Sequence, residues 1–135
     1  MNTESFLKSF IEWVTHQQAV EALALVGSHA RGTASETSDV DLMILTSERA
    51  QYLLNPVWVP LFGDVERVQK ETWGAVETIR ATYTNGLEVE YNFASSAWAD
   101  VPVDPGTRRV VNEGFRILFD RKGRLAALLL ASSKE

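Results

Sequence analysis

The feature that most constrains this chain is a turn and a carboxylate pair, held at a fixed spacing between two apolar segments. Gly27-Ser28 is followed by ten residues and then by Asp39-Val40-Asp41. Residues 22–26, before the turn, form a continuous apolar run typical of a strand buried on both faces. Residues 39–46 alternate in character, as a strand does when its two faces meet different surroundings. The sequence therefore predicts a turn after one strand and two carboxylates at the start of the next.

The Gly27-Ser28 turn has the features of a phosphate-binding site. A strand that stops at a glycine and turns directly into a helix leaves backbone N–H groups without partners, and these groups bind phosphate together with the helix dipole. Gly27 allows close backbone approach, the Ser28 hydroxyl adds a donor, and Arg31 lies one turn later. A lone Gly-Ser pair is also compatible with an ordinary turn and a serine helix cap. No glycine-rich Walker sequence is present, so the turn is not a P-loop.

The carboxylate pair points to a cation. Asp39 and Asp41 are two residues apart, so both project from one face of the expected strand while Val40 takes the other. Two carboxylates this close resist joint ionisation unless a cation lies between them, and hard oxygen ligands suit magnesium. The pair is also compatible with a strand-start aspartate and a solvated surface charge. Asp41, however, interrupts the apolar pattern where the strand enters the core, which favours a functional role.

A third carboxylate is expected on a later strand, because two-metal phosphoryl chemistry uses a further acidic ligand. Glu88 and Glu90 share one face of that strand. Asn85-Gly86 predicts a two-residue hairpin turn, which would pair Tyr83 with Glu88 and Ala81 with Glu90. The small alanine would leave room for a metal ion, and this favours Glu90. Glu88 remains the alternative.

The chain as a whole reads as one α/β (α+β) domain over residues 1–135. We expect further elements, at the following positions: a helix over 4–18 capped by Thr3, a helix after Ser47 that stops before Pro56, hairpin strands at 76–84 and 87–94, a helix opened by Asp104-Pro105 and closed by Gly114, an edge strand over 115–120 and a terminal helix over 125–132.

Composition limits the classes of function. The net charge of −5 argues against a protein that binds nucleic acid mainly through its phosphates. It leaves room for a nucleotide, which a metal ion and a few local donors can hold. The start of the chain lacks the pattern of a secretion signal, and the longest apolar run, 125–131, is too short to span a bilayer. We therefore expect a cytoplasmic protein with no membrane partner.

With these residues in view, the chain resembles the DNA polymerase β-like nucleotidyltransferase superfamily, and in particular minimal and antibiotic nucleotidyltransferase domains. The matching elements are Gly27-Ser28, the ten-residue spacer, Asp39-Val40-Asp41 and a later strand with Glu90, and the segment 98–109 is similar to small stand-alone members. The resemblance implies a mixed β-sheet with helices packed against it. In one respect the sequence departs from the family, in which the third carboxylate is often Asp.

The resemblance also implies an activity: transfer of a nucleoside monophosphate, AMP from ATP in the first instance, to a hydroxyl group. By this resemblance Asp39 and Asp41 would bridge two Mg²⁺ ions and Glu90 would complete one site. Gly27, Ser28 and Arg31 would hold the phosphates that leave as pyrophosphate. The acceptor could be a small molecule, or a protein such as a HEPN-type toxin modified by an antitoxin nucleotidyltransferase. The alternative is a non-catalytic nucleotide-binding or antitoxin module, against which three gathered carboxylates argue.

Overall fold

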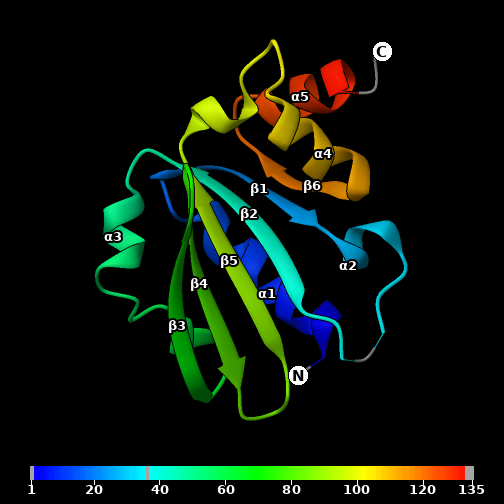
Figure 1. Ribbon diagram of the computed structural model, residues 1–135. Coiled ribbons are helices and arrows are strands. Elements are labelled where there is room, and N and C mark those ends of the chain that lie inside the picture. The colour runs from blue at the N-terminus through cyan, green and yellow to red at the C-terminus, as the bar shows by residue number, and fades with distance from the viewer. Residues whose placement is uncertain (1, 36, 133–135) are drawn as a thin grey trace.

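The computed structural model describes residues 2–35 and 37–132, and within them the chain forms a six-stranded mixed sheet (Figure 1). The strand order is β3-β4-β5-β2-β1-β6, with β2 and β5 parallel and all other neighbours antiparallel. The strands are β1 (Val20–Val26), β2 (Val40–Thr46), β3 (Val65–Trp73), β4 (Val76–Tyr83), β5 (Glu88–Ala94) and β6 (Phe115–Asp120). The helices are α1 (Thr3–Thr15), α2 (Ser28–Arg31), α3 (Arg49–Leu53), η1 (Val59–Phe62), η2 (Ser96–Ala99), α4 (Pro105–Glu113) and α5 (Arg124–Ser132). The expected α/β class is confirmed.

Two apolar cores lie on the two faces of the sheet. On one face, α1, α3 and η1 pack aromatic side chains against β1, β2, β4 and β5. On the other face, η2, α4 and α5 cover small and aliphatic residues of β1, β2 and β6. Figure 1 shows α1 behind the sheet and α4 and α5 together beside β6. The second core includes Met43 and Leu45 but stops before Asp41, so the polar residues of β4 and β5 stay on the open part of this face.

Several helix boundaries differ from the sequence prediction because other side chains supply the caps. Asn2, rather than Thr3, caps α1 by accepting a hydrogen bond from the Ser5 N–H at 2.8 Å. Helix α3 begins after Glu48 rather than being capped by Ser47. The predicted cap of α4 is confirmed: the Asp104 carboxylate accepts hydrogen bonds from the first turn. The edge strand β6 and the terminal helix α5 are confirmed as well. None of the described helices is long and apolar enough to cross a membrane.

The hairpin between β4 and β5 has a three-residue turn, so the two-residue prediction is wrong. The Gly86 N–H donates to the Tyr83 carbonyl at 2.9 Å, and the Tyr83 N–H donates to the Leu87 carbonyl at 2.8 Å. Gly86 has a φ of 93°, the left-handed conformation that three-residue hairpin loops need after their first turn. The extra loop residue shifts the pairing of the two strands by one position.

This shift changes the neighbours of both glutamates. Glu90 lies opposite Arg80, and Glu88 lies opposite Thr82. Ala81 is instead the partner of Val89 on the buried face. The argument that a small neighbour leaves room beside Glu90 is therefore wrong, because the neighbour of Glu90 is a long cationic side chain.

Strand β3 is an edge strand that the sequence did not predict. Its nine residues are mostly exposed, and charged side chains lie along it on both faces. Without one apolar face, such a segment lacks the two-residue periodicity by which strands are recognised. The strand matters to the site because it places Glu71 beside β4, on the same face as Arg80.

Candidate functional site

Asp41 and Glu90 lie side by side at the start of the only parallel strand pair among the described residues. Asp41 on β2 is the register partner of Glu90 on β5, and on its other side it faces Val26, the last residue of β1. Asp39 comes immediately before β2 and two residues before Asp41. The sheet therefore places Asp41 between Glu90 and the turn that follows β1.

The Arg80 side chain gathers three carboxylates of this face. Its Nη1 lies 2.9 Å from the Asp39 Oδ2, and its Nη2 forms ion pairs with Glu90 and, at 3.4 Å, with the Glu71 Oε1. The side chains are half-buried rather than exposed to bulk solvent. Sequence reasoning missed Arg80. A three-residue hairpin turn would have revealed it, because the resulting register places Arg80 directly beside Glu90.

The Asp41 carboxyl is the most perturbed group of the site. Burial, a hydrogen bond with Glu90 and the charges of Glu90 and Asp39 raise its pKa to about 8, and Arg80 acts in the opposite direction. Its Oδ1 atom is buried, and no hydrogen-bond partner reaches it from the described part of the chain. A buried carboxylate with an unsatisfied oxygen and acidic neighbours binds either a proton or a cation.

Glu88 lies on the same side of the sheet but nearer the hairpin. A hydrogen bond with Asp39 and the charge of Asp39 raise the pKa of Glu88, with a further contribution from burial. Glu88 is thus the neighbour of Asp39, whereas Glu90 is the neighbour of Asp41. A hollow of about 610 Å³ begins beside Glu88 and runs between the start of α1 and the β4–β5 turn.

Gly27 brings the turn into direct contact with the Asp41 carboxylate. It has a φ of 75° and forms the N-cap of α2. A Cβ atom added to Gly27 would lie 2.7 Å from the Asp41 Oδ2, closer than any real side chain tolerates. The backbone conformation therefore favours glycine here, and any side chain at this position would require the Asp41 carboxylate to move. Ser28 is the first residue of α2 and Gly27 is its N-cap, so the alternative interpretation of Ser28 as the helix cap is wrong.

A second glycine, which sequence reasoning treated only as a helix stop, supports this turn. The Gly27 N–H donates to the Gly114 carbonyl at 3.3 Å. A Cβ atom on Gly114 would lie 2.6 Å from the Gly27 carbonyl oxygen, and the φ of Gly114 is 142°. The connection between α4 and β6 thus fixes the position of the turn after β1.

Arg31 and His29 make contacts that hold the surrounding loops. The Arg31 Nη1 donates to the Glu113 carbonyl at 2.5 Å, and its Nε donates to the Thr33 Oγ1 at 3.1 Å. The guanidinium that was expected to bind phosphate is therefore engaged at the end of α4. The His29 Nε2 lies 3.2 Å from the Ser38 carbonyl and links α2 to the segment just before Asp39.

The donor chemistry of the site suits magnesium, although the present arrangement centres on Arg80. Carboxylate oxygens are the ligands that this ion prefers, and the unsatisfied Asp41 Oδ1 is available to it. Over residues 2–35 and 37–132, however, no three acidic or histidine side chains are grouped so that they could hold a metal ion. Asp39 and Glu90 converge on the Arg80 guanidinium instead.

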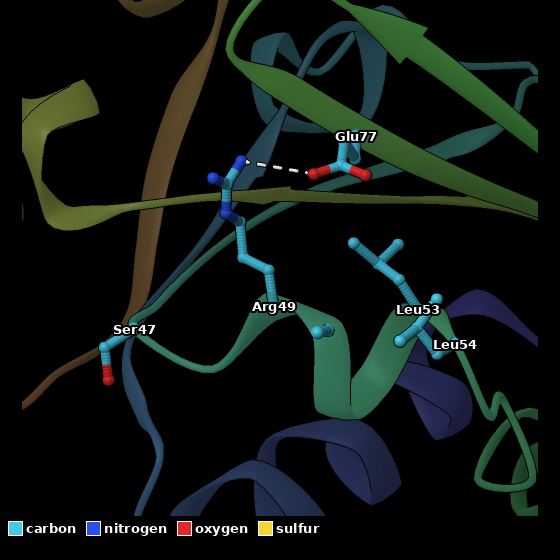
Figure 2. Close-up of a pocket in the computed structure, with 6 residues that line it drawn as sticks. Ser47, Arg49, Leu53, Leu54 and Glu77 are labelled. Atoms are coloured by element: carbon cyan, nitrogen blue, oxygen red, sulfur yellow. Dashed lines mark ion pairs between the residues drawn. The ribbon is translucent and has the colours of Figure 1, made fainter.

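Figure 2 shows a second hollow, which does not include the carboxylates described above. It measures about 280 Å³ and lies between α3 and β4, where Arg49 forms an ion pair with Glu77 at 3.4 Å. Glu77 and Arg80 are three residues apart on a regular strand, so they project from opposite faces of the sheet. This hollow is therefore separated from the carboxylates by the sheet itself.

Comparisons with known proteins agree with the geometry. The nucleotidyltransferase domain family matches residues 7–93, more than half of the chain. Among solved structures, an aminoglycoside 6-adenyltransferase from Bacillus subtilis has a TM-score of 0.54 and 13% identity over 70% of this chain, which spans only 35% of that protein. No curated protein gives a significant match. The family match includes the Gly27 turn, both aspartates and Glu90, and the chain belongs to the nucleotidyltransferase domain family.

Proposed function

We propose that this chain transfers a nucleoside monophosphate from a nucleoside triphosphate to a hydroxyl group, with magnesium as cofactor and ATP as the first candidate donor. The observation that carries the proposal is the contact between Gly27 and Asp41, where a Cβ atom would lie 2.7 Å from the carboxylate. This contact makes one site out of a turn suited to phosphate and a carboxylate suited to a metal ion.

Asp39, Asp41 and Glu90 would hold the metal ions. Asp41 has an unsatisfied buried oxygen, Glu90 is its neighbour in the parallel register, and Asp39 reaches the same cluster through Arg80. Magnesium in such a site supplies charge neutralisation at the phosphates and a lower pKa for the attacking hydroxyl. Glu88 is the alternative third ligand, because it contacts Asp39.

The turn would hold the phosphates that leave. The first N–H groups of a helix have no intrahelical partners, and Gly27 lets phosphate approach the start of α2, where Ser28 adds a hydroxyl. Arg31 would have to exchange its contact with the Glu113 carbonyl before it could join them. Its part in phosphate binding is therefore secondary to that of the turn.

The reaction forms one bond and breaks one bond. The acceptor oxygen attacks the α-phosphorus in line with the bridging oxygen, the bond to that oxygen breaks, and pyrophosphate leaves with its electron pair. The proton of the acceptor hydroxyl passes to solvent or to a nearby base. Positioning and charge neutralisation provide most of the catalysis in phosphoryl chemistry of this kind.

The acceptor is best identified by the label it acquires. The protein is incubated with Mg²⁺, cell lysate and each of the four nucleoside triphosphates, labelled in turn at the α- and γ-phosphate. Acid precipitation then separates a protein acceptor, such as a HEPN-type toxin, from a small molecule such as an aminoglycoside. Transfer of α-label, absent with Asp41→Asn, supports the proposal. Transfer of γ-label alone, or nucleotide binding without any transfer, contradicts it.

A further inference from the structure

We propose that Arg80 is a positioning residue which holds the carboxylate cluster while no metal ion is bound, and which moves toward Glu71 when a divalent cation enters. The proposal rests on the proposed function, because it assumes that Asp39, Asp41 and Glu90 receive the cation. It adds a role for two residues that the activity itself does not require.

The position of Arg80 is the first argument. Arg80 lies on β4, with Glu90 beside it on β5 and Gln69 beside it on β3. From there its guanidinium reaches Asp39 at 2.9 Å and also pairs with Glu90. One side chain thus links two candidate metal ligands that come from different strands. Without a cation of some kind, these carboxylates would repel each other.

Competition for the same oxygen atoms is the second argument. A guanidinium binds carboxylates through fixed N–H donors, and a magnesium or manganese ion binds the same oxygens directly. The guanidinium and the divalent ion also repel each other when they contact the same carboxylates. A divalent ion that takes Asp39, Asp41 and Glu90 therefore has to break the bonds of Arg80 with Asp39 and Glu90. In the metal-free arrangement no three acidic or histidine side chains of the described residues are grouped for a metal ion, and Asp39 and Glu90 both contact the Arg80 guanidinium.

Glu71 gives the displaced side chain a partner. It lies on β3, across β4 from Glu90, and its Oε1 is 3.4 Å from the Arg80 Nη2. Glu71 shares the face of Arg80 because its register partner, Thr78, is two residues away from Arg80 on β4. A rotation of the Arg80 side chain toward β3 would release Asp39 and Glu90 while keeping the guanidinium paired.

The test measures metal binding without any reaction. Wild-type protein and Arg80→Gln are titrated with Mn²⁺ at pH 8.0, and the free ion is counted by its paramagnetic resonance signal. Loss of the competing charge should raise the Mn²⁺ affinity about tenfold. The repulsion between a divalent ion and a unit charge a few ångströms away lowers the affinity by at least about that factor. Arg80→Lys should fall between the two, because one ammonium cannot span both carboxylates; this variant also keeps the test decisive if Arg80→Gln folds poorly.

A matched control is available on the opposite face of the sheet. Arg49→Gln removes one positive charge and one ion pair to a β4 carboxylate, that of Glu77, without touching the cluster (Figure 2). Its Mn²⁺ affinity should equal that of the wild-type protein. If Arg80→Gln binds Mn²⁺ no more tightly than Arg49→Gln, the inference about Arg80 is wrong although the metal site of the proposed function stands. If neither the wild-type protein nor Arg80→Gln binds Mn²⁺, both proposals are wrong.

A double-mutant cycle tests the role of Glu71. Glu71→Gln should weaken Mn²⁺ binding several-fold in the wild-type background, because Arg80 then has only the metal ligands as partners. In the Arg80→Gln background the same change should have a much smaller effect. Equal effects in both backgrounds would show that Glu71 acts only as a distant charge, and the proposed movement toward β3 would be wrong.

Discussion

The contact between Gly27 and Asp41 predicts a specific loss of stability for Gly27→Ala. Alanine at the φ of 75° and ψ of −152° of Gly27 has a conformational cost of about 1–3 kcal/mol, because few residues other than glycine adopt this region. The new Cβ atom would also lie 2.7 Å from the Asp41 Oδ2, so the carboxylate must move, at a further cost of about 1–3 kcal/mol. The free energy of unfolding should fall by about 2–6 kcal/mol, which lowers the melting temperature by roughly 8–24 °C for a chain of this size.

Gly32→Ala is a control for alanine at a positive φ without a neighbouring side chain. Gly32 has a φ of 80° and a ψ of 15°, in the left-handed helical region, and a Cβ atom there would meet nothing within 4 Å. This variant should lose only the conformational part, roughly 4–8 °C by thermal unfolding followed with circular dichroism. In an Asp41→Ala background, Gly27→Ala should lose the contact part of its cost and destabilise by about 1–3 kcal/mol less than in the wild-type background. Equal losses for Gly27→Ala in the wild-type and Asp41→Ala backgrounds would refute the close approach of the turn to the carboxylate.

Four other predictions concern the same site and the turn beside it. Because the pKa of Asp41 is raised to about 8, the folded state holds a proton that the unfolded state loses near pH 4; metal-free stability should therefore fall as pH rises from 4 to 8, and Asp41→Asn should flatten this slope. The same variant should gain less thermal stability than the wild-type protein from ATP with Mg²⁺, and equal gains would exclude Asp41 as a ligand. Glu90→Gln should reduce transfer of α-label by several orders of magnitude, and Glu88→Gln should have a mild effect; the reverse order would make Glu88 the third ligand. Gly114→Ala should destabilise the fold, as measured by urea unfolding, because its Cβ atom would lie 2.6 Å from a backbone oxygen that cannot rotate away.

The strands next to the Gly27 turn could be predicted because their patterns are strong. The apolar run before Gly27 and the alternation after Asp39 each match a strand that the structure contains. Asp41 could be singled out because a charged residue is unusual where a strand pattern is otherwise apolar. Strand β3 could not be predicted, because its residues are mostly exposed, both of its faces carry charges, and it lacks the two-residue alternation of apolar and polar residues.

The environment of Glu90 could not be predicted because it depends on one turn. Asn85-Gly86 favours a two-residue loop, but Gly86 can equally provide the left-handed position of a three-residue loop, and the structure has the latter. A one-residue change in register exchanges the two faces of a strand, so Arg80 rather than Ala81 lies beside Glu90. The parallel pairing of Asp41 with Glu90 comes from tertiary structure, which a local pattern does not encode.

The most direct test of the central claim is a crystal structure of the protein with Mn²⁺ and an ATP analogue that cannot be cleaved between the α- and β-phosphates. Anomalous scattering identifies the manganese without ambiguity. We expect manganese at Asp39, Asp41 and Glu90, the terminal phosphates at the Gly27 turn, and the Arg80 guanidinium paired with Glu71. Manganese bound away from these carboxylates, or an analogue that leaves the Gly27 turn empty, would contradict the account of the turn and the carboxylates as one site.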